Sequence, residues 1–237
     1  MTPKQGEKSL KPGDVISYMQ MCSAEGVNLQ RGMNFRLRGG MSVILMSVRA
    51  GAPYDDKVEK GGKVLIYEGH DIAQTKEGPK AKSVDQPMTN PSGSLTQNGL
   101  FFHAAEDFKD NKQPAEKVKV YEKIKSGIWV YNGIFNLINA FIEKDKLRNI
   151  FKFKLELDDT DDNRSGGILE LEHNRMIPSS VKLKVWKRDK GKCVKCGKPD
   201  NLHFDHIIPF SKGGSSLVAE NIQILCAKHN LQKSDKI

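Results

Sequence analysis

The sequence predicts an α+β fold in two parts, a larger strand-rich region and a smaller C-terminal region. The chain has 237 residues, a length that suits one or two domains. Its first 158 residues contain short apolar runs bounded by Gly, Pro or charged residues, as β-strands are. Three of its four Cys residues fall within 34 residues of each other near the C-terminus. With 38% apolar and 28% charged residues, both parts can bury a core, which excludes a disordered or fibrous chain.

The first part is expected to consist mainly of strands. Residues 1–11 predict a flexible lead, and the segment 69–97, with three Pro and little periodicity, predicts a functional loop over at least part of its length. Several apolar runs alternate with polar residues, as half-buried strands do. Strands are expected at residues 15–21, 42–48, 63–67, 118–121, 127–131 and 150–157.

An acidic stretch marks the predicted end of the first domain. Residues 156–162 place five acids among seven positions, a run that repels itself. We therefore expect the first domain to cover residues 12–158 and an acidic linker to follow over residues 159–177. Calcium binding is the alternative, but the stretch lacks the glycine and ligand spacing of a calcium loop.

The second part, residues 178–237, is expected to begin with an amphipathic helix. Ser179 and Ser180 can cap a helix over residues 181–189, with Val181 and Val185 on one side and basic residues on the other. The basic side is expected to contact phosphates, a merely solvated face being the alternative. A Cys-containing turn, a strand over 202–208, a glycine loop and a helix from about 219 to 233 are expected to follow.

Net charge is unevenly distributed along the chain. The total is +9, made up of +5 over residues 1–150, −3 over 151–177 and +7 over 178–237. A basic excess is compatible with a polyanionic partner. The longest apolar run, residues 41–48, is too short to span a bilayer, and the first residues lack an apolar signal core, so we expect no membrane partner and a cytoplasmic location.

The cysteines and histidines of the second part have the spacing of a metal site. Cys193 and Cys196 form a C-x2-C pair, and after 29 intervening residues Cys226 and His229 form a C-x2-H pair. Four such ligands suit tetrahedral zinc, and because protein fills all four positions the zinc would be structural. Reduced cysteines without a metal are the alternative, and His203 is a second candidate for the histidine ligand.

The residues around these pairs resemble the HNH nuclease family, which has the ββα-metal fold. The match covers almost all of the last 60 residues. Its elements occur in the family's order: Arg188-Asp189, the first Cys pair, Asp205-His206-Ile207 and Pro209, Gly213-Gly214, Glu220-Asn221 and Gln223, Leu225-Cys226, Asn230 and Lys233. The resemblance implies that Asn221 braces a loop and orients the catalytic histidine.

Phosphodiester hydrolysis explains the residue types at this motif. A neutral His206 can take a proton from the attacking water. Asp205 and Asn230 supply hard oxygen ligands for Mg²⁺ or Mn²⁺, which would stabilise charge on the leaving oxygen. An isolated Asp-His pair is more often a surface hydrogen bond, so the catalytic interpretation depends on the surrounding zinc motif.

The first part resembles the SRA domain, a reader that flips a modified cytosine out of DNA. The similarity runs from about residue 12 to 158 and implies a strongly twisted β-barrel or saddle. Residues 26–35 and 70–84 take the positions of the family's two groove-inserting loops. The similar residues, in order, are Gly26-Val27, Ser42 to Leu45, Tyr54 to Asp56, Gly61-Gly62, Tyr67, Gly69, Asp85-Gln86, Thr89-Asn90, Val118 to Tyr121, Tyr131, Gly133 and Phe135.

A pocket for a flipped cytosine needs aromatic faces and a carboxylate that accepts hydrogen bonds from the base. By the resemblance, Tyr54 and Tyr67 are the stacking residues and Asp56 reads the base, while Glu68 stands at the pocket rim where the family often has Thr. One extra residue lies between the tyrosines, so Asp55 could replace Asp56. Without the resemblance, Tyr67 would be interpreted as a core residue and Asp55-Asp56 as a turn.

Together the two resemblances predict a modification-dependent, type IV-like restriction endonuclease. It would read 5-methyl- or 5-hydroxymethylcytosine in double-stranded DNA and cut the backbone with the HNH site. Each nuclease domain has one catalytic centre, so cutting both strands implies a homodimer, at least on DNA, or sequential nicking. The alternatives are a non-enzymatic reader with a zinc module and an HNH nuclease indifferent to modification.

Overall fold

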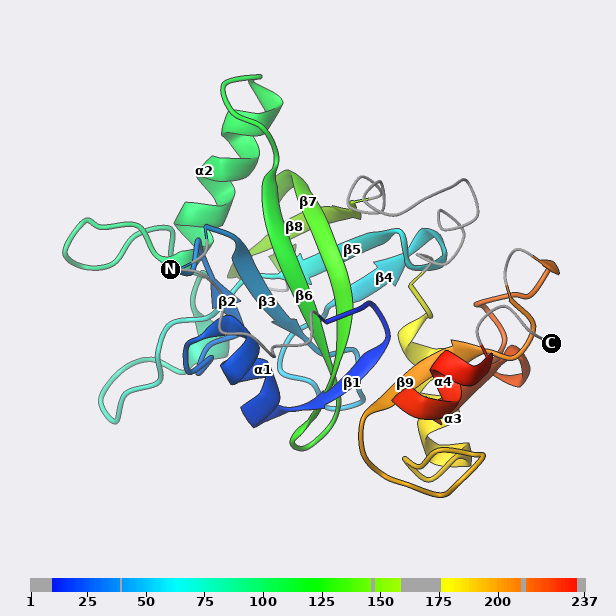
Figure 1. The fold of residues 1–237 in the computed structure, drawn as a ribbon. Coiled ribbons are helices and arrows are strands. Elements are labelled where there is room, and N and C mark those ends of the chain that lie inside the picture. The colour runs from blue at the N-terminus through cyan, green and yellow to red at the C-terminus, as the bar shows by residue number, and fades with distance from the viewer. Residues whose placement is uncertain (1–9, 39, 146–147, 159–175, 210–211, 234–237) are drawn as a thin grey trace.

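A computed structural model describes residues 10–38, 40–145, 148–158, 176–209 and 212–233 of the chain (Figure 1). Helices and strands are both present, which confirms the predicted α+β class. The helices are α1 (Tyr18–Glu25), α2 (Gln97–Lys109), α3 (Ser179–Arg188) and α4 (Ala227–Lys233), with 3-10 turns η1 (Lys60–Gly62), η2 (Ala81–Ser83) and η5 (Ala219–Asn221). The strands are β1 (Asp14–Ser17), β2 (Met33–Asn34), β3 (Ser42–Met46), β4 (Lys57–Glu59), β5 (Val64–Glu68), β6 (Glu116–Lys125), β7 (Ile128–Asp145), β8 (Arg148–Leu157), β9 (Leu202–His206) and β10 (Ile222–Cys226).

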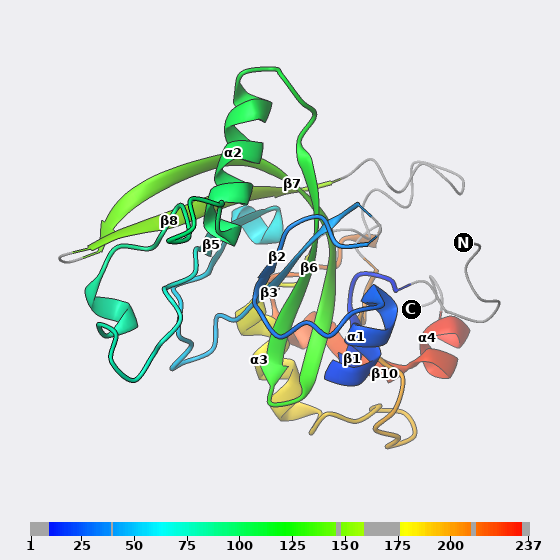
Figure 2. The same cartoon turned by 90° about the vertical axis from the view of Figure 1, so that its left-hand side faces the viewer.

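One bent sheet connects the strands of both parts. Its main path runs β10-β9-β1-β7-β6-β3-β2, and β8 pairs with β7 and β5, which in turn pairs with β4. The long strand β7 faces β1 and β6 with its first half and β8 with its second half. Figure 2 shows the β7–β8 hairpin curving away from β6. The β3–β6 pair is parallel, whereas the other ladders between the described strands are antiparallel.

Helix α1 replaces the second half of the strand expected over residues 15–21. Ser17 ends β1 and caps the helix, because its side chain accepts a hydrogen bond from Gln20 N while the Gln20 side chain accepts one from Ser17 N. This reciprocal capping box satisfies two backbone donors at the helix start. Gly26 ends the helix in the left-handed region at φ +66°. The expected strand was therefore wrong after Ser17.

The core of the first part lies between the sheet and α2. Phe101 and Ala105 of α2 are fully buried against apolar residues of the strands. Thr96 caps α2 through a hydrogen bond from Gly99 N to its hydroxyl. A second cluster packs α1 against the other side of the strands, with Met21, Tyr121 and Trp129 among its members.

The second part is a β-hairpin between two helices. Helix α3 begins at Ser179 with Pro178 as its N-cap, and no side chain caps it, unlike the predicted serine cap. The expected helix over 219–233 was wrong in its first half, since residues 222–226 form β10 along β9. A short apolar run cannot be assigned to strand or helix by periodicity alone. Lys182 was also expected on the basic, solvent-facing side of α3, yet it is buried.

The junction between the parts is described only at its two ends. Most of the predicted lead, residues 1–9, and most of the predicted linker, residues 159–175, lie outside the described residues. Asp158 is buried, and its carboxylate pairs with Lys117 and accepts a hydrogen bond from Asn136 Nδ2 at 3.3 Å. Met176 and Ile177, at the far end of the predicted linker, are also buried. Across the described part of the chain, we find no helix with the length and apolar character that crossing a membrane requires.

Candidate functional site

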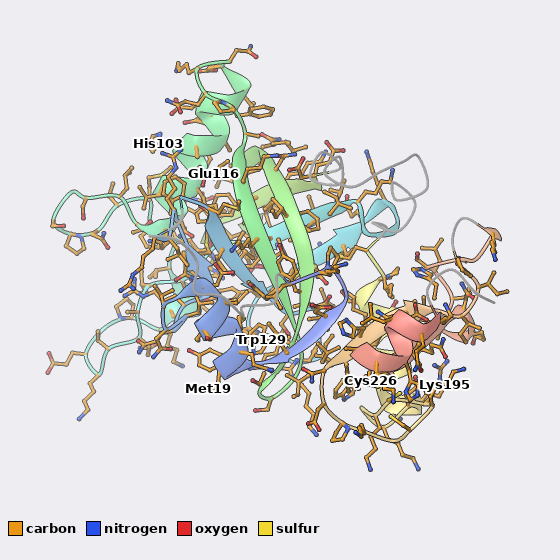
Figure 3. All side chains as sticks on the ribbon, viewed as in Figure 1. Met19, His103, Glu116, Trp129, Lys195 and Cys226 are labelled. Atoms are coloured by element: carbon orange, nitrogen blue, oxygen red, sulfur yellow. The ribbon has the colours of Figure 1, made fainter. Side chains whose placement is uncertain are left out.

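The four predicted zinc ligands lie together between the first Cys turn and the start of α4. Their ligand atoms are all within 4.8 Å of one another. His229 Nδ1 is 3.4 Å from Cys193 Sγ and 3.3 Å from Cys226 Sγ, and Cys196 Sγ is 3.8 Å from Cys226 Sγ. Figure 3 shows Cys226 among the elements of the second part. His203 is not in this cluster, since its Nδ1 pairs with the Asp14 carboxylate.

These separations fit a tetrahedral zinc ion. Zn–S bonds of about 2.3 Å and Zn–N bonds of about 2.0–2.1 Å place tetrahedral ligands roughly 3.6–3.8 Å apart, close to the observed values. Burial opposes ionisation of the Cys193 thiol, but hydrogen bonds from backbone N–H groups and the contact with His229 lower its pKa to about 6. A thiol that ionises readily is a good metal ligand. The residues therefore suit a closed, structural zinc.

Asp205 and His206 end strand β9, where the hairpin pairing places them opposite β10. Gln223 of β10 donates a hydrogen bond from Nε2 to Asp205 Oδ2 at 3.0 Å. His206 Nε2 lies 2.7 Å from Ser216 Oγ. Both catalytic candidates are partly exposed, so water and a phosphate group can approach them. Gln223 and Ser216 thus orient the two side chains.

Asn221 closes the loop that follows His206. Its Oδ1 accepts a hydrogen bond from Ile208 N at 2.8 Å, and its Nδ2 donates to Ile208 O at 3.0 Å and to Ser215 O at 3.1 Å. Gly214 is needed here, because a Cβ on this residue would lie 1.8 Å from Ile208 O. The amide side chain therefore holds both ends of the loop, which agrees with the bracing expected from the resemblance.

Helix α4 brings Lys233 to the end of β9. Lys233 Nζ is 3.1 Å from Asp205 Oδ2 and also donates to His206 O. Asn230 lies three residues earlier on α4, a spacing that places both residues on one face of the helix. Asp205 and Asn230 offer the hard oxygens that Mg²⁺ or Mn²⁺ prefers, with the Lys233 ammonium beside one of the Asp205 oxygens.

The Arg188-Asp189 pair ties α3 to the hairpin. Arg188 donates to Ala219 O at 2.7 Å and to Ile222 O at 2.6 Å, and it pairs with the Asp189 carboxylate. Asp189 Oδ2 in turn accepts a hydrogen bond from Ile224 N at 3.0 Å. This motif is therefore a structural clamp that fixes β10 and, through β10, the position of Asp205.

A cavity of about 390 Å³ opens in the first part, within the size range of small-ligand sites. Its lining consists of Ser47 to Arg49, Gly51 to Pro53, Tyr54, Asp55, Asp56, Glu68, Lys82 and Asp145. Three of the four predicted pocket residues thus share one cavity. Tyr67 does not line it: it is 1% exposed and packs in the core under α2.

Asp56 is buried at the wall of this cavity. Its Oδ2 accepts a hydrogen bond from Ser47 N at 3.0 Å and its Oδ1 one from Glu68 N at 3.1 Å. Burial raises the pKa of Asp56 to about 7, although both hydrogen bonds favour the ionised form. A carboxylate has about four lone-pair sites, so each oxygen can accept one more hydrogen bond. The neighbouring Asp55 is exposed and pairs with Lys57 at 2.9 Å.

Glu68 is buried among cations that sequence reasoning did not identify. Its Oε2 lies 3.1 Å from Lys152 Nζ, and its Oε1 lies 3.6 Å from Arg148 Nη2 and 3.7 Å from Lys82 Nζ. Lys152 alternates with Phe residues on β8, a pattern that predicts a solvated lysine. The face of β8 that carries Lys152 instead lies under the cavity, which no local signal in the sequence indicates.

The segment 70–84 packs on Tyr54. The His70 ring stacks on Tyr54 with centroids 5.2 Å apart, and Lys82 Nζ lies 4.3 Å from the Tyr54 ring centroid. His70 Nε2 is also 3.0 Å from Tyr67 Oη, and burial lowers the pKa of His70 to about 4, so the ring is neutral. His70 thus connects the two predicted stacking tyrosines.

Motif residues on either side of this segment anchor it to β8. Gln86 donates from Nε2 to Gly69 O at 2.7 Å and accepts from Phe151 N at 2.8 Å. Asp85 accepts from Asn149 N at 2.7 Å and from Asn149 Nδ2 at 2.9 Å. The ends of the segment are therefore fixed, and Lys82 near its second end lines the cavity.

Comparison with known proteins identifies the second part. The sequence model of the family described as HNH endonuclease matches residues 193–236, so this part of the predicted resemblance is confirmed. No curated protein matches the chain.

Among solved structures, the chain is similar to SUVH5 SRA in a complex with fully methylated CG DNA, at 22% identity and a TM-score of 0.43, over 63% of this chain and 90% of that one. It is also similar to SUVH5 SRA bound to fully hydroxymethylated CG DNA, at 23% identity and a TM-score of 0.44, over 63% of this chain and 90% of that one. The Type IV phosphorothioation-dependent restriction endonuclease ScoMcrA matches 98% of this chain and 56% of its own, at 17% identity and a TM-score of 0.42.

Proposed function

Because the chain carries an HNH endonuclease domain over residues 193–236, we propose that it is a modification-dependent restriction endonuclease that cuts DNA containing modified cytosine. The observation that carries the cutting activity is the placement of Asp205 and His206 at the end of β9, beside Asn221 and α4. The proposed reading of a modified base is supported by the sequence motif of the first part and by the cavity that Tyr54, Asp56 and Glu68 share.

In the proposed reaction His206 takes a proton from the water that attacks the phosphorus. Ser216 orients the imidazole, and Asn221 keeps the following loop from displacing it. Asp205, held by Gln223, and Asn230 would bind the divalent cation. When bound, Mg²⁺ or Mn²⁺ supplies Lewis-acid stabilisation of the charge on the leaving oxygen. The zinc cluster takes no part in the chemistry but fixes the start of α4, and hence Asn230.

In the proposed reading step a flipped cytosine displaces Lys82 from the Tyr54 ring, stacks there and donates hydrogen bonds from its amino group to Asp56. An ionised carboxylate accepts from cytosine N4, a contact that distinguishes this base. Tyr67 supports the pocket from the core through His70 rather than touching the base. Flipping costs a few kcal/mol of unstacking, and by the resemblance the segments 26–35 and 70–84 would enter the duplex and offset that cost.

Digestion of matched duplexes tests the proposal. A duplex with one 5-methylcytosine or 5-hydroxymethylcytosine and its unmodified twin would be incubated with the full chain, Zn²⁺ and either Mg²⁺ or Mn²⁺. Cutting of the modified duplex alone is the expected result. Equal cutting of both duplexes would indicate a nuclease that is indifferent to modification. Binding without cutting, with either Mg²⁺ or Mn²⁺, would indicate a non-enzymatic reader.

Two further expectations accompany the proposal. Each chain has one HNH site, so we propose that two copies meet on DNA to cut both strands; light scattering that finds only monomer, free and on DNA, would contradict this. We also expect the protein to act in the cytoplasm, where thiolate ligands stay reduced.

A further inference from the structure

The two parts share one β-sheet. Strand β1 pairs with β7 on one side and with β9 on the other, so Val15 faces both Val130 and Leu202. Phe204 N donates to Gly13 O at 3.1 Å, and the His203 side chain pairs with Asp14. Strand β9 also carries Asp205 and His206 at its end. The strand that holds the nuclease residues is thus hydrogen-bonded directly to the first part.

They also share a hydrophobic core. Ile124 of β6 and Val130 of β7 are buried in the same cluster as Val181 and Val185 of α3 and the apolar residues of β9 and β10. Met176, just before α3, is buried in the core cluster of the first part, and Gly62 makes room for it, since a Cβ there would lie 2.2 Å from Met176 O. Neither part therefore completes its core alone.

A buried ion pair fixes α3 on the strands. Lys182 of α3 is 1% exposed, and its Nζ donates to Glu122 Oε2 at 2.7 Å and to Asn132 Oδ1 at 2.6 Å. Asn132 also donates to Glu122 Oε2 at 3.1 Å. Asn132 is the extra residue of a β-bulge, with Gly133 beside it at φ +99°. Bulges redirect side chains, and this one directs Asn132 toward Lys182.

From these contacts we infer that the nuclease part is held rigidly on the first part, with Lys182 and Gly13 as positioning residues, so that the cut falls at a fixed distance from the base in the Tyr54 cavity. The fixed distance depends on the proposed function, whereas the rigid junction does not. A flexible tether over residues 159–177 would instead let the nuclease range over roughly 22–26 Å, or about seven base pairs.

Mapping the cuts on a duplex with one modified cytosine tests the inference. The full chain is expected to cut each strand within about two nucleotides of one position, since one step along a strand spans about 3.4 Å. Lys182→Met should widen this distribution toward the one expected for a flexible tether. Lys184→Met removes an exposed charge from the same helix and should leave the distribution unchanged. Modification-dependent cuts spread over about seven base pairs in the unchanged chain would overturn the inference, and so would a folded Lys182→Met variant with the original cut distribution.

A glycine pair gives a second comparison. Gly13 (φ +93°) and Gly127 (φ +76°) both adopt backbone conformations that strain an added side chain, but only a Cβ on Gly13 would approach β9, 3.2 Å from Phe204 O. Gly13→Ala should therefore widen the cut distribution while Gly127→Ala leaves it narrow. The same effect from both variants would indicate general destabilisation and contradict the positioning role of Gly13.

Unfolding tests the rigid junction without DNA. The chain has two Trp residues, Trp129 in β7 and Trp186 in α3, so each part carries its own fluorescent reporter (Figure 3 labels Trp129). In the zinc-loaded variants Trp129→Phe and Trp186→Phe, the remaining tryptophan should report the same urea midpoint. If Trp186 unfolds at clearly lower urea while Trp129 stays native, the two parts are independent and the inference fails. Coincident midpoints with equal cutting of both duplexes would support the junction and reject the proposed reading of modified cytosine.

Discussion

The nuclease site and the cavity of the first part differ in how the chain builds them. The nuclease residues come from one β-hairpin and the helix after it, and the zinc cluster ties the start of that helix to the first Cys turn. The cavity is lined by Glu68 of β5, Asp145 at the end of β7, Lys82 and residues of the segment 47–56, which only long-range strand pairing brings together. A site made of consecutive elements can be recognised from ligand spacing, whereas a site made by sheet topology can be recognised only by resemblance.

The two sites also differ in how deeply their carboxylates are buried. Asp205 is partly exposed, and its Oδ2 lies beside Lys233 and Gln223. Asp56 and Glu68 are buried, and the burial of Asp56 raises its pKa to about 7. The first arrangement suits metal chemistry and the second suits recognition of a neutral, hydrogen-bonding ligand.

Removing zinc should have the largest effect, because it destroys the frame of the nuclease site. Binding of structural zinc contributes about 10–16 kcal/mol in zinc-finger peptides, and the second part has little core of its own. Cys226→Ser is expected to abolish cutting and release zinc, measured by a colorimetric chelator. Cys22→Ser is the control, since Cys22 lies outside the metal cluster. Normal cutting by Cys226→Ser would show that the cluster is not needed for the site.

Loss of the general base should come next. His206→Ala is expected to lower the cutting rate by roughly 10²–10⁴-fold while DNA affinity stays unchanged. Ser216→Ala, which removes only the partner of His206 Nε2, should have a smaller effect on rate. Single-turnover cutting and fluorescence anisotropy measure the two quantities. An unchanged rate for His206→Ala would contradict the mechanism.

Removing the Asn221 side chain, which braces the loop after His206, should lower the cutting rate only by displacing His206. Asn221→Ala removes three hydrogen bonds to the loop after His206, and a displacement of about 1 Å can cost roughly 10²-fold in rate. The zinc content and the midpoint of Trp186 unfolding should stay close to those of the unchanged chain. A variant that has lost its zinc would assign Asn221 to folding instead.

The corresponding test at the cavity is Asp56→Ala. It should lower the preference for modified over unmodified DNA by about 1–3 kcal/mol and leave the cutting rate at saturating DNA unchanged. It also leaves Ser47 N and Glu68 N without their acceptor, at a cost of about 1–3 kcal/mol of stability, so thermal unfolding must be measured alongside. Asp55→Ala is the matched control, and loss of preference in that variant alone would assign base reading to Asp55.

The smallest expected effect is a pH dependence of the preference for modified DNA. Because the pKa of Asp56 is raised to about 7, its carboxylate is mostly protonated at pH 6 and mostly ionised at pH 8. In the proposed reading step only the ionised form accepts hydrogen bonds from the base, so affinity should rise roughly tenfold between those values. The stability contribution has the opposite sign, since a raised pKa favours the folded state at low pH and is lost as pH rises through about 7. A flat affinity profile would exclude Asp56 as the acceptor.

These contrasts explain how far the sequence could be interpreted alone. Its ligand spacing predicted that the three Cys residues and His229 lie together, as the structure shows, whereas the bound metal and the catalytic roles at the end of β9 stay predictions. It did not predict α1, where the Ser17–Gln20 capping box outweighs strand alternation, or β10, a short apolar run that fits either element. It also missed the burial of Lys152 and Lys182, because lysine normally indicates a solvated face and only the tertiary pairing with Glu68 and Glu122 shows otherwise.

The most direct measurement is the ratio of cutting rates on two duplexes that differ only in one modified cytosine, with the zinc-loaded full chain and Mg²⁺ or Mn²⁺. The account predicts cutting of the modified duplex and none above background of its unmodified twin, with the preference reduced in Asp56→Ala and the cutting rate lowered roughly 10²–10⁴-fold in His206→Ala. Equal rates on the two duplexes would contradict it.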